Sequence, residues 1–100
     1  MAQELERIFP GFLEIRDEEL RRRAEEAMEL AMAAGGWCYD TLPLCPVTLN
    51  WRGCDISWIE HVTDVTQLCL MEFDALEKYY RRHGVPFRRD LVAAGALLHD

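Results

Sequence analysis

The sequence predicts an all-α domain, a bundle of helices, on three observations. Apolar residues recur at the 3.6-residue period of amphipathic helices in residues 17–34, 57–82 and 90–98. Residue types that cap helices precede these segments, and glycine or proline follows the first two. No segment alternates apolar and polar residues as half-buried strands do. A chain of 100 residues, 50% of them hydrophobic, is long enough for one domain with a modest core.

The first predicted helix follows Asp17 and ends near Ala34. Aspartate accepts hydrogen bonds from the free N–H groups of a first turn, and two glutamates follow it there. Gly35 and Gly36 end the periodic pattern. The face expected to turn inward carries Leu20, Ala24, Ala27, Met28 and Ala31.

Residues 36–55 predict an irregular connection. The stretch GWCYDTLPLCPVTLNWRGCD contains two prolines, two glycines, three of the four cysteines and two tryptophans, and it follows neither the helical nor the strand period. Connections this long are uncommon in compact domains and are often functional. We therefore divide the chain into residues 1–55, an N-terminal amphipathic helix and structured loop, and residues 56–100, the helices that follow.

Two further helices are predicted in residues 56–100. Ser57 and Glu60 have the spacing of a capping box, and the helix that they start runs to about Arg82, before the segment HGVPF. Asp90 is expected to cap the last helix. The predicted inward positions are Trp58, Val62, Val65, Leu68, Cys69, Leu76 and Tyr79 in the long helix, and Leu91, Ala94, Leu97 and Leu98 in the last.

Composition limits the partners and the compartment. The 18 acidic and 11 basic residues give a net charge of −7, which disfavours binding to a long nucleic-acid backbone. No apolar run approaches the roughly 20 residues of a membrane-spanning helix, so no membrane partner is expected. The N-terminal MAQELERIFP lacks the apolar core of a signal peptide. The expected location is therefore the cytoplasm, where Cys38, Cys45, Cys54 and Cys69 stay reduced.

The last two residues, His99 and Asp100, follow the apolar stretch LVAAGALL. Neighbouring helix residues point about 100° apart, so both side chains can lean toward one point at the end of a packed helix. Imidazole nitrogen and carboxylate oxygen suit a divalent metal such as manganese, iron, cobalt, nickel or zinc. His61, at the start of the preceding helix, is the candidate third ligand, because the two helices are expected to pack antiparallel. Antiparallel packing permits this meeting without requiring it.

The segment ISWIEHVTDVTQLCLMEFDALEKYYRRHGVPFRRDLVAAGALLHD, residues 56–100, resembles the first half of the HD-domain metal-dependent phosphohydrolases. The resemblance consists of a histidine on one helix and a His-Asp pair after LL at the end of a later apolar helix. It implies an HD-type helical bundle in which His61, His99 and Asp100 are three of four protein ligands of a divalent metal (Mn, Fe, Co, Ni, Zn or Mg). The family's fourth ligand, a later aspartate, has no counterpart, so the chain is interpreted as truncated within the domain.

The resemblance also implies a function, the hydrolysis of a nucleotide or another small phosphate ester by the complete protein. The metal would polarise the phosphoryl oxygen and lower the pKa of the attacking water, and Asp100 would be the catalytic residue that orients this water. Residues 1–100 alone are expected to bind metal weakly and to be inactive, because metal ligands need a rigid supporting shell. Trp51 and Arg52 are candidate substrate-binding residues, offering an aromatic face and a fork for phosphate.

Each of these assignments has a simpler alternative. His99 and Asp100 can form a solvated helix end, and His61 can interact with acidic residues of its own first turn. Trp51 can be a core residue beside a solvated Arg52. The chain as a whole can be a non-catalytic binding or regulatory module, or a homo-oligomer that buries the apolar face of its last helix against a second copy.

Overall fold

The computed structural model describes residues 2–100, and 67% of the chain is helical. The elements are the α-helices α1 (Ala2–Ile8), α2 (Glu18–Ala34), α3 (Trp58–Arg82) and α4 (Arg89–Leu98) and the short 3-10 helices η1 (Pro10–Glu14) and η2 (Leu42–Leu44). Residues 2–100 contain no strand, only an isolated antiparallel bridge between Pro46 and Ser57. The predicted all-α class is confirmed.

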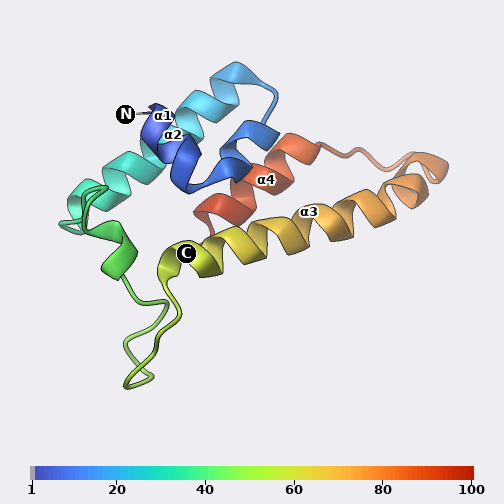
Figure 1. The fold of residues 1–100 in the computed structure, drawn as a ribbon. Helices are drawn as coiled ribbons and strands as arrows, with labels where there is room; N and C mark the ends of the chain where they lie inside the picture. The colour runs from blue at the N-terminus through green and yellow to red at the C-terminus, as the bar shows by residue number, and fades with distance from the viewer. Residues whose placement is uncertain (1) are drawn as a thin grey trace.

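The antiparallel pair of α3 and α4 runs through the centre of the molecule (Figure 1). α3 is the longest helix, and it extends well past α4 at the end where the turn of residues 83–88 joins them. α1, η1 and α2 lie on the other side of α4. Because α4 returns along α3, the C-terminus lies beside the start of α3.

Residues 2–15, for which no helix is predicted above, form α1 and η1. A Pro-Gly pair interrupts the helical period between them, which hides the apolar pattern in the sequence. Gly11 lets η1 approach the central pair closely, since a Cβ there would lie 2.9 Å from Thr66 Cγ2 and 3.3 Å from Leu97 Cδ2. The segment fills much of the core with side chains that are at most 1% exposed: Leu5, Phe9, Phe12 and Ile15.

Helix α2 has the predicted bounds, and Ala24 and Met28 of its predicted inward face are buried, with Leu20 packed against the core. Asp17 caps it, with its carboxylate accepting a hydrogen bond from the backbone N–H of Leu20 at 3.0 Å. Ala27 and Ala31, predicted to turn inward, are exposed. The buried face also includes a glutamate, which a count of apolar residues leaves out. The buried residues are Ala24, Glu25, Met28 and Met32.

Helix α3 has the predicted bounds and the predicted capping box. Of the residues predicted to face inward, Val62 is buried, whereas Leu68, which is 63% exposed, and Tyr79 point to solvent. Those two assignments are wrong because the buried face contains a threonine, which a search for apolar residues does not count. The Thr66 hydroxyl donates to the Val62 carbonyl at 2.8 Å, so this polar group is satisfied inside the core. The buried face is Val62, Thr66, Leu70 and Phe73.

Asp90 does not cap α4 as predicted. The helix starts two residues earlier than predicted, at Arg89, with Arg88 as its N-cap. The Asp90 carboxylate instead accepts hydrogen bonds from the backbone N–H groups of Arg16, at 3.1 Å, and Asp17, at 2.9 Å. It therefore fastens α4 to the segment before α2, and a tertiary contact takes the place of a local cap.

The apolar face of α4 is largely covered within the chain. α4 packs against η1, α2 and α3. Leu91 and Leu98, also predicted to face inward, are exposed, because the buried face is made mainly of alanines that let the neighbouring helices approach. The buried face of α4 is therefore covered without a second copy of the chain. The formation of a homo-oligomer stays a prediction. The buried residues are Ala93, Ala94, Ala96 and Leu97.

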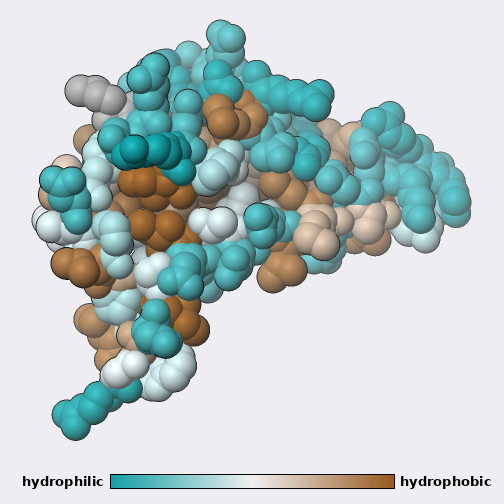
Figure 2. Space-filling view, viewed as in Figure 1, coloured by the Kyte–Doolittle hydropathy of each residue, from teal (hydrophilic) through white to brown (hydrophobic). Residues whose placement is uncertain are grey.

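One hydrophobic core takes side chains from both residues 1–55 and residues 56–100, and the division at residue 55 stays a prediction. Hydrophilic side chains predominate over the N-terminal helices and the α3–α4 turn, whereas apolar side chains gather between the second half of α2 and the start of α3 (Figure 2). Within residues 2–100, every helix is too short or too polar to cross a membrane. The four cysteines are free thiols in this structure, and the reduced compartment stays a prediction.

Candidate metal centre

His61, His99 and Asp100 lie together where the start of α3 meets the end of α4. His61 is in the first turn of α3, His99 is the C-cap of α4, and Asp100 follows it. One ligand atom of each side chain lies within 4.8 Å of those of the other two. His61 Nε2 is 3.3 Å from His99 Nε2 and 3.3 Å from a carboxylate oxygen of Asp100. The antiparallel pair thus brings His61 to the adjacent pair His99 and Asp100, although His61 and His99 are 38 positions apart in the sequence.

The backbone of α4 orients the His99 ring. His99 Nδ1 lies 2.6 Å from the carbonyl oxygen of Ala96. A carbonyl only accepts hydrogen bonds, so Nδ1 carries the proton and donates it. In the neutral ring, Nε2 then holds the lone pair, and it faces His61. A hydrogen bond of this kind on the far nitrogen is typical of histidines that bind metals.

The distance between the two imidazole Nε2 atoms fits two ligands of a single metal ion. Two nitrogens bound at about 2.1 Å and roughly 90–110° apart are separated by about 3.0–3.4 Å. The observed 3.3 Å between the two Nε2 atoms falls in this range. The side chains of His61 and Asp100 are 32% and 43% exposed, so an ion and a further ligand can reach them from solvent. Two imidazoles and one carboxylate suit the divalent transition metals.

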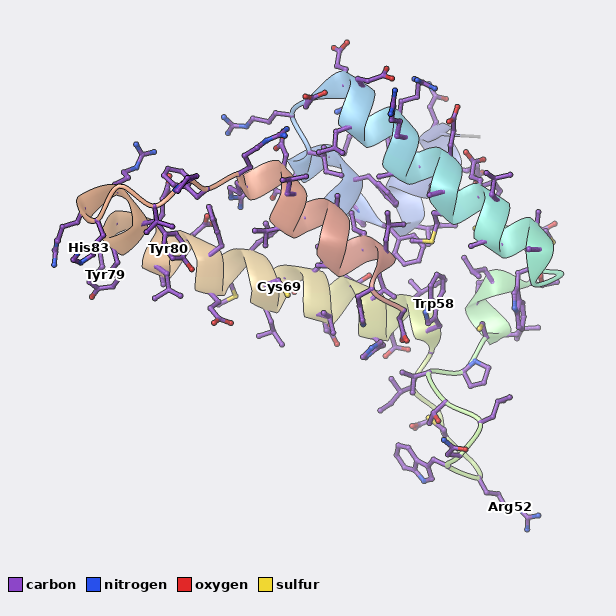
Figure 3. All side chains as sticks on the ribbon, turned by 180° about the vertical axis from the view of Figure 1, so that it is seen from behind. Arg52, Trp58, Cys69, Tyr79, Tyr80 and His83 are labelled. Atoms are coloured by element: carbon purple, nitrogen blue, oxygen red, sulfur yellow. The ribbon has the colours of Figure 1, made fainter. Side chains whose placement is uncertain are left out.

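The structure does not bring Trp51 and Arg52 to this cluster. Both are exposed in the loop before α3, so Trp51 is not a core residue either. Arg52 lies at the tip of that loop and points away from the helices (Figure 3). Their predicted role in substrate binding stays a prediction. The third histidine, His83, lies at the opposite end of α3 (Figure 3).

A cavity of about 350 Å³ lies beside Asp100, and the sequence did not predict it. Trp37, which follows α2, and Trp58, which starts α3, are among its walls, with Met32 and Cys45. Trp37 directly follows the Gly-Gly pair that ends α2, and Trp58 directly follows the serine that caps α3. That position was the available clue, but only the folded chain shows that both residues line one cavity.

Comparison with known proteins gives one informative relative. The dihydroneopterin 2',3'-cyclic phosphate phosphodiesterase of Methanocaldococcus jannaschii is 36% identical over 100 residues, which cover 96% of this chain and 39% of that enzyme. The chain therefore spans about two fifths of the length of this relative. No protein-family model matches the chain, and no solved structure matches it. The relative acts on a small phosphate ester, whereas membership of the HD-domain family stays a prediction.

Proposed function

We propose that this chain provides the metal-binding part of a phosphohydrolase that acts on a small phosphate ester. The observation that carries the proposal is the convergence of His61, His99 and Asp100, whose ligand atoms lie within 4.8 Å of one another. The similarity to a phosphodiesterase over 96% of the chain supports the reaction class. A metal also explains how a chain with a net charge of −7 attracts an anionic substrate.

Each residue of the cluster has a distinct role in this proposal. His61 and His99 would each give a ring nitrogen to the ion, and the Ala96 carbonyl, which accepts from Nδ1 of His99, leaves Nε2 of that ring for the ion. Asp100 contributes a carboxylate oxygen and is placed to orient a water molecule near the ion. The bound cation supplies Lewis acidity, which polarises a phosphoryl oxygen and makes water acidic enough to attack at neutral pH.

A cyclic phosphodiester joined to a ring system is the first substrate class to test. The relative is named for the 2',3'-cyclic phosphate of dihydroneopterin. Hydrolysis of such a ring breaks one P–O bond with water and leaves a phosphate monoester. Nucleotides share the phosphate ester and the heterocycle, so nucleoside 2',3'-cyclic phosphates belong to the same screen.

The experiment is calorimetric titration of manganese and zinc into the chain and two variants. We expect His99→Ala to abolish metal binding, because it removes the donor that faces His61 at 3.3 Å. His83→Ala is the matched control, since it removes a histidine at the other end of α3 (Figure 3). Equal losses in the two variants, or retained binding in His99→Ala, would contradict the site. Hydrolysis of the cyclic phosphates is then measured with and without the metal that binds.

A further inference from the structure

The cavity beside Asp100 has the chemistry of a pocket for a flat ring. Its walls include two indoles, a thioether and a thiol, from Trp37, Trp58, Met32 and Cys45. Burial raises the pKa of the Cys45 thiol, so this group is neutral at neutral pH. The residues that line the cavity include no lysine, arginine or histidine, so the cavity itself offers no cation for a phosphate. A volume of about 350 Å³ is in the range of small-molecule sites.

The end of α2 fixes Trp37 as one wall. Gly36, with φ of 79°, is in the left-handed conformation that ends many helices. Gly36 N–H donates to the Ala33 carbonyl at 3.1 Å, and Trp37 N–H donates to the Met32 carbonyl at 2.8 Å. The indole then lies against Gly35, where a Cβ would be 3.1 Å from Trp37 Cδ1. The wall is therefore set by hydrogen bonds of the main chain.

The start of α3 fixes Trp58 as another wall. Trp58 follows the capping residue Ser57, and its N–H donates to the Cys45 carbonyl at 2.8 Å, which closes the loop onto the helix. Its indole packs edge-on against Phe9, with ring centroids 5.6 Å apart. Figure 3 shows Trp58 at the end of α3 that meets the chain's C-terminus. The pocket thus adjoins the candidate metal centre through Asp100.

We propose that this pocket binds a bicyclic nitrogen heterocycle, of the pterin or purine class, as the ring part of the substrate. An aromatic lining without cations accepts the ring, and the phosphate ester extends past Asp100 toward His61 and His99. The inference rests on the proposed function for the place of the phosphate and, through the named relative, for the choice of ring class. The ring site itself is testable without metal and without phosphate.

The test is calorimetric titration of the metal-free chain with dihydroneopterin and with guanosine, neither of which carries a phosphate. Both pterin and purine rings stack on indoles, and the tighter of the two identifies the ring class. We expect Trp37→Ala to weaken binding by about 10-fold or more, as loss of a stacking aromatic does, and Trp37→Phe to weaken it much less. Ala31→Leu fills the cavity from the exposed face of α2 without removing a core side chain, and it should also weaken binding.

Tyr79→Ala is the matched control, because it removes an exposed aromatic ring at the far end of α3 (Figure 3) and should leave ring binding unchanged. Circular dichroism confirms that each variant is folded. Two results would overturn the ring site: no binding of either ring to the wild-type chain, or equal affinity in wild type, Trp37→Ala and Ala31→Leu. Failure of the proposed function has another signature, retained metal binding in His99→Ala, so the two failures are distinguishable.

Discussion

The two ends of the α3–α4 pair use polar side chains in opposite ways. At the end where α4 begins, Arg89 donates from Nε and Nη2 to both oxygens of Asp74, at 2.8 and 3.1 Å, and from Nη1 to Glu14 at 2.9 Å. Its hydrogen bonds hold the pKa of Asp74 below its usual value. At the end where α4 stops, His61 Nε2 lies 3.3 Å from His99 Nε2 and 3.3 Å from a carboxylate oxygen of Asp100.

The difference separates polar groups that hold the fold from those that are free to bind. Arg89 joins α4 to α3 and η1 with complementary charges, so its partners are already satisfied. At the opposite end, two imidazole nitrogens and a carboxylate oxygen converge, and a bound cation would be a shared partner for all three. We therefore expect substitutions at the first end to change stability, and those at the second to change metal binding.

The largest effect on stability is expected at Glu25, a buried residue of α2. Arg89 is held by three hydrogen bonds to carboxylates, whereas one carboxylate oxygen of Glu25 is left without a hydrogen bond. The side chain of Glu25 is 4% exposed. Burial first, and then a hydrogen bond to Glu6 and the charge of Glu6, raise the pKa of Glu25 to about 7. Because this pKa is above the ordinary 4.5, stability is lost as pH rises from about 4.5 to about 7.

Glu25→Gln should remove that loss. We expect the variant to be about 1–3 kcal/mol more stable than wild type at pH 8 and nearly equal to it at pH 4. Urea unfolding at pH 4, 6 and 8 measures the difference. Glu26→Gln, on the exposed side of the same helix, is the control and should shift stability little at any pH. A gain that does not depend on pH would refute the pKa explanation.

The next effect is expected at Asp90, at the structural end. Asp90→Ala removes the acceptor of the Arg16 and Asp17 N–H groups, and should cost about 1–2 kcal/mol in urea unfolding at pH 7. These N–H groups lower the pKa of Asp90, so its contribution exists above the ordinary value of 3.8 and fades as the pH falls below it. The difference from wild type should therefore shrink in acid.

Asp55→Ala removes an exposed carboxylate from the loop before α3 and is the control for this substitution. It should leave the free energy of unfolding within about 0.5 kcal/mol of wild type. If Asp55→Ala and Asp90→Ala cost the same at pH 7, the hydrogen bonds of Asp90 do not fasten α4.

Local signals predicted α2, α3 and α4 but not α1, and long-range contacts explain the true role of Asp90. Asp17 and Ser57 cap helices through residues three positions away, so the starts of α2 and α3 were predictable. Asp90 looked like the same signal, but its partner Asp17 lies 73 positions earlier. No local pattern distinguishes these two uses of an aspartate. The buried Thr66 was missed for a different reason: its hydroxyl bonds locally to the Val62 carbonyl, and a search for apolar residues does not count a threonine.

The sequence predicted the residues of the candidate metal centre, whereas it did not predict those of the neighbouring pocket. His61 and His99 are 38 positions apart, and they were paired by a family pattern together with antiparallel packing of adjacent helices. Trp37 and Trp58 belong to no such pattern, and their place in one cavity depends on the fold of the irregular connection between them. That connection was expected to be functional. Its predicted residues, Trp51 and Arg52, lie on its exposed part.

The smallest effect on stability is expected at His61, and it tests the comparison most directly. The side chain is partly exposed, and its close contacts are His99 and Asp100, so His61→Ala should change the free energy of unfolding by no more than about 0.5 kcal/mol. Metal binding should be lost, because one of three donors is removed. His83→Ala serves as the control in both measurements. An exposed ion pair contributes at most about 1 kcal/mol to the free energy of unfolding. If His61→Ala lowers this free energy by more than about 1 kcal/mol, the contact of His61 with Asp100 is structural, and the two ends of the α3–α4 pair do not differ as argued.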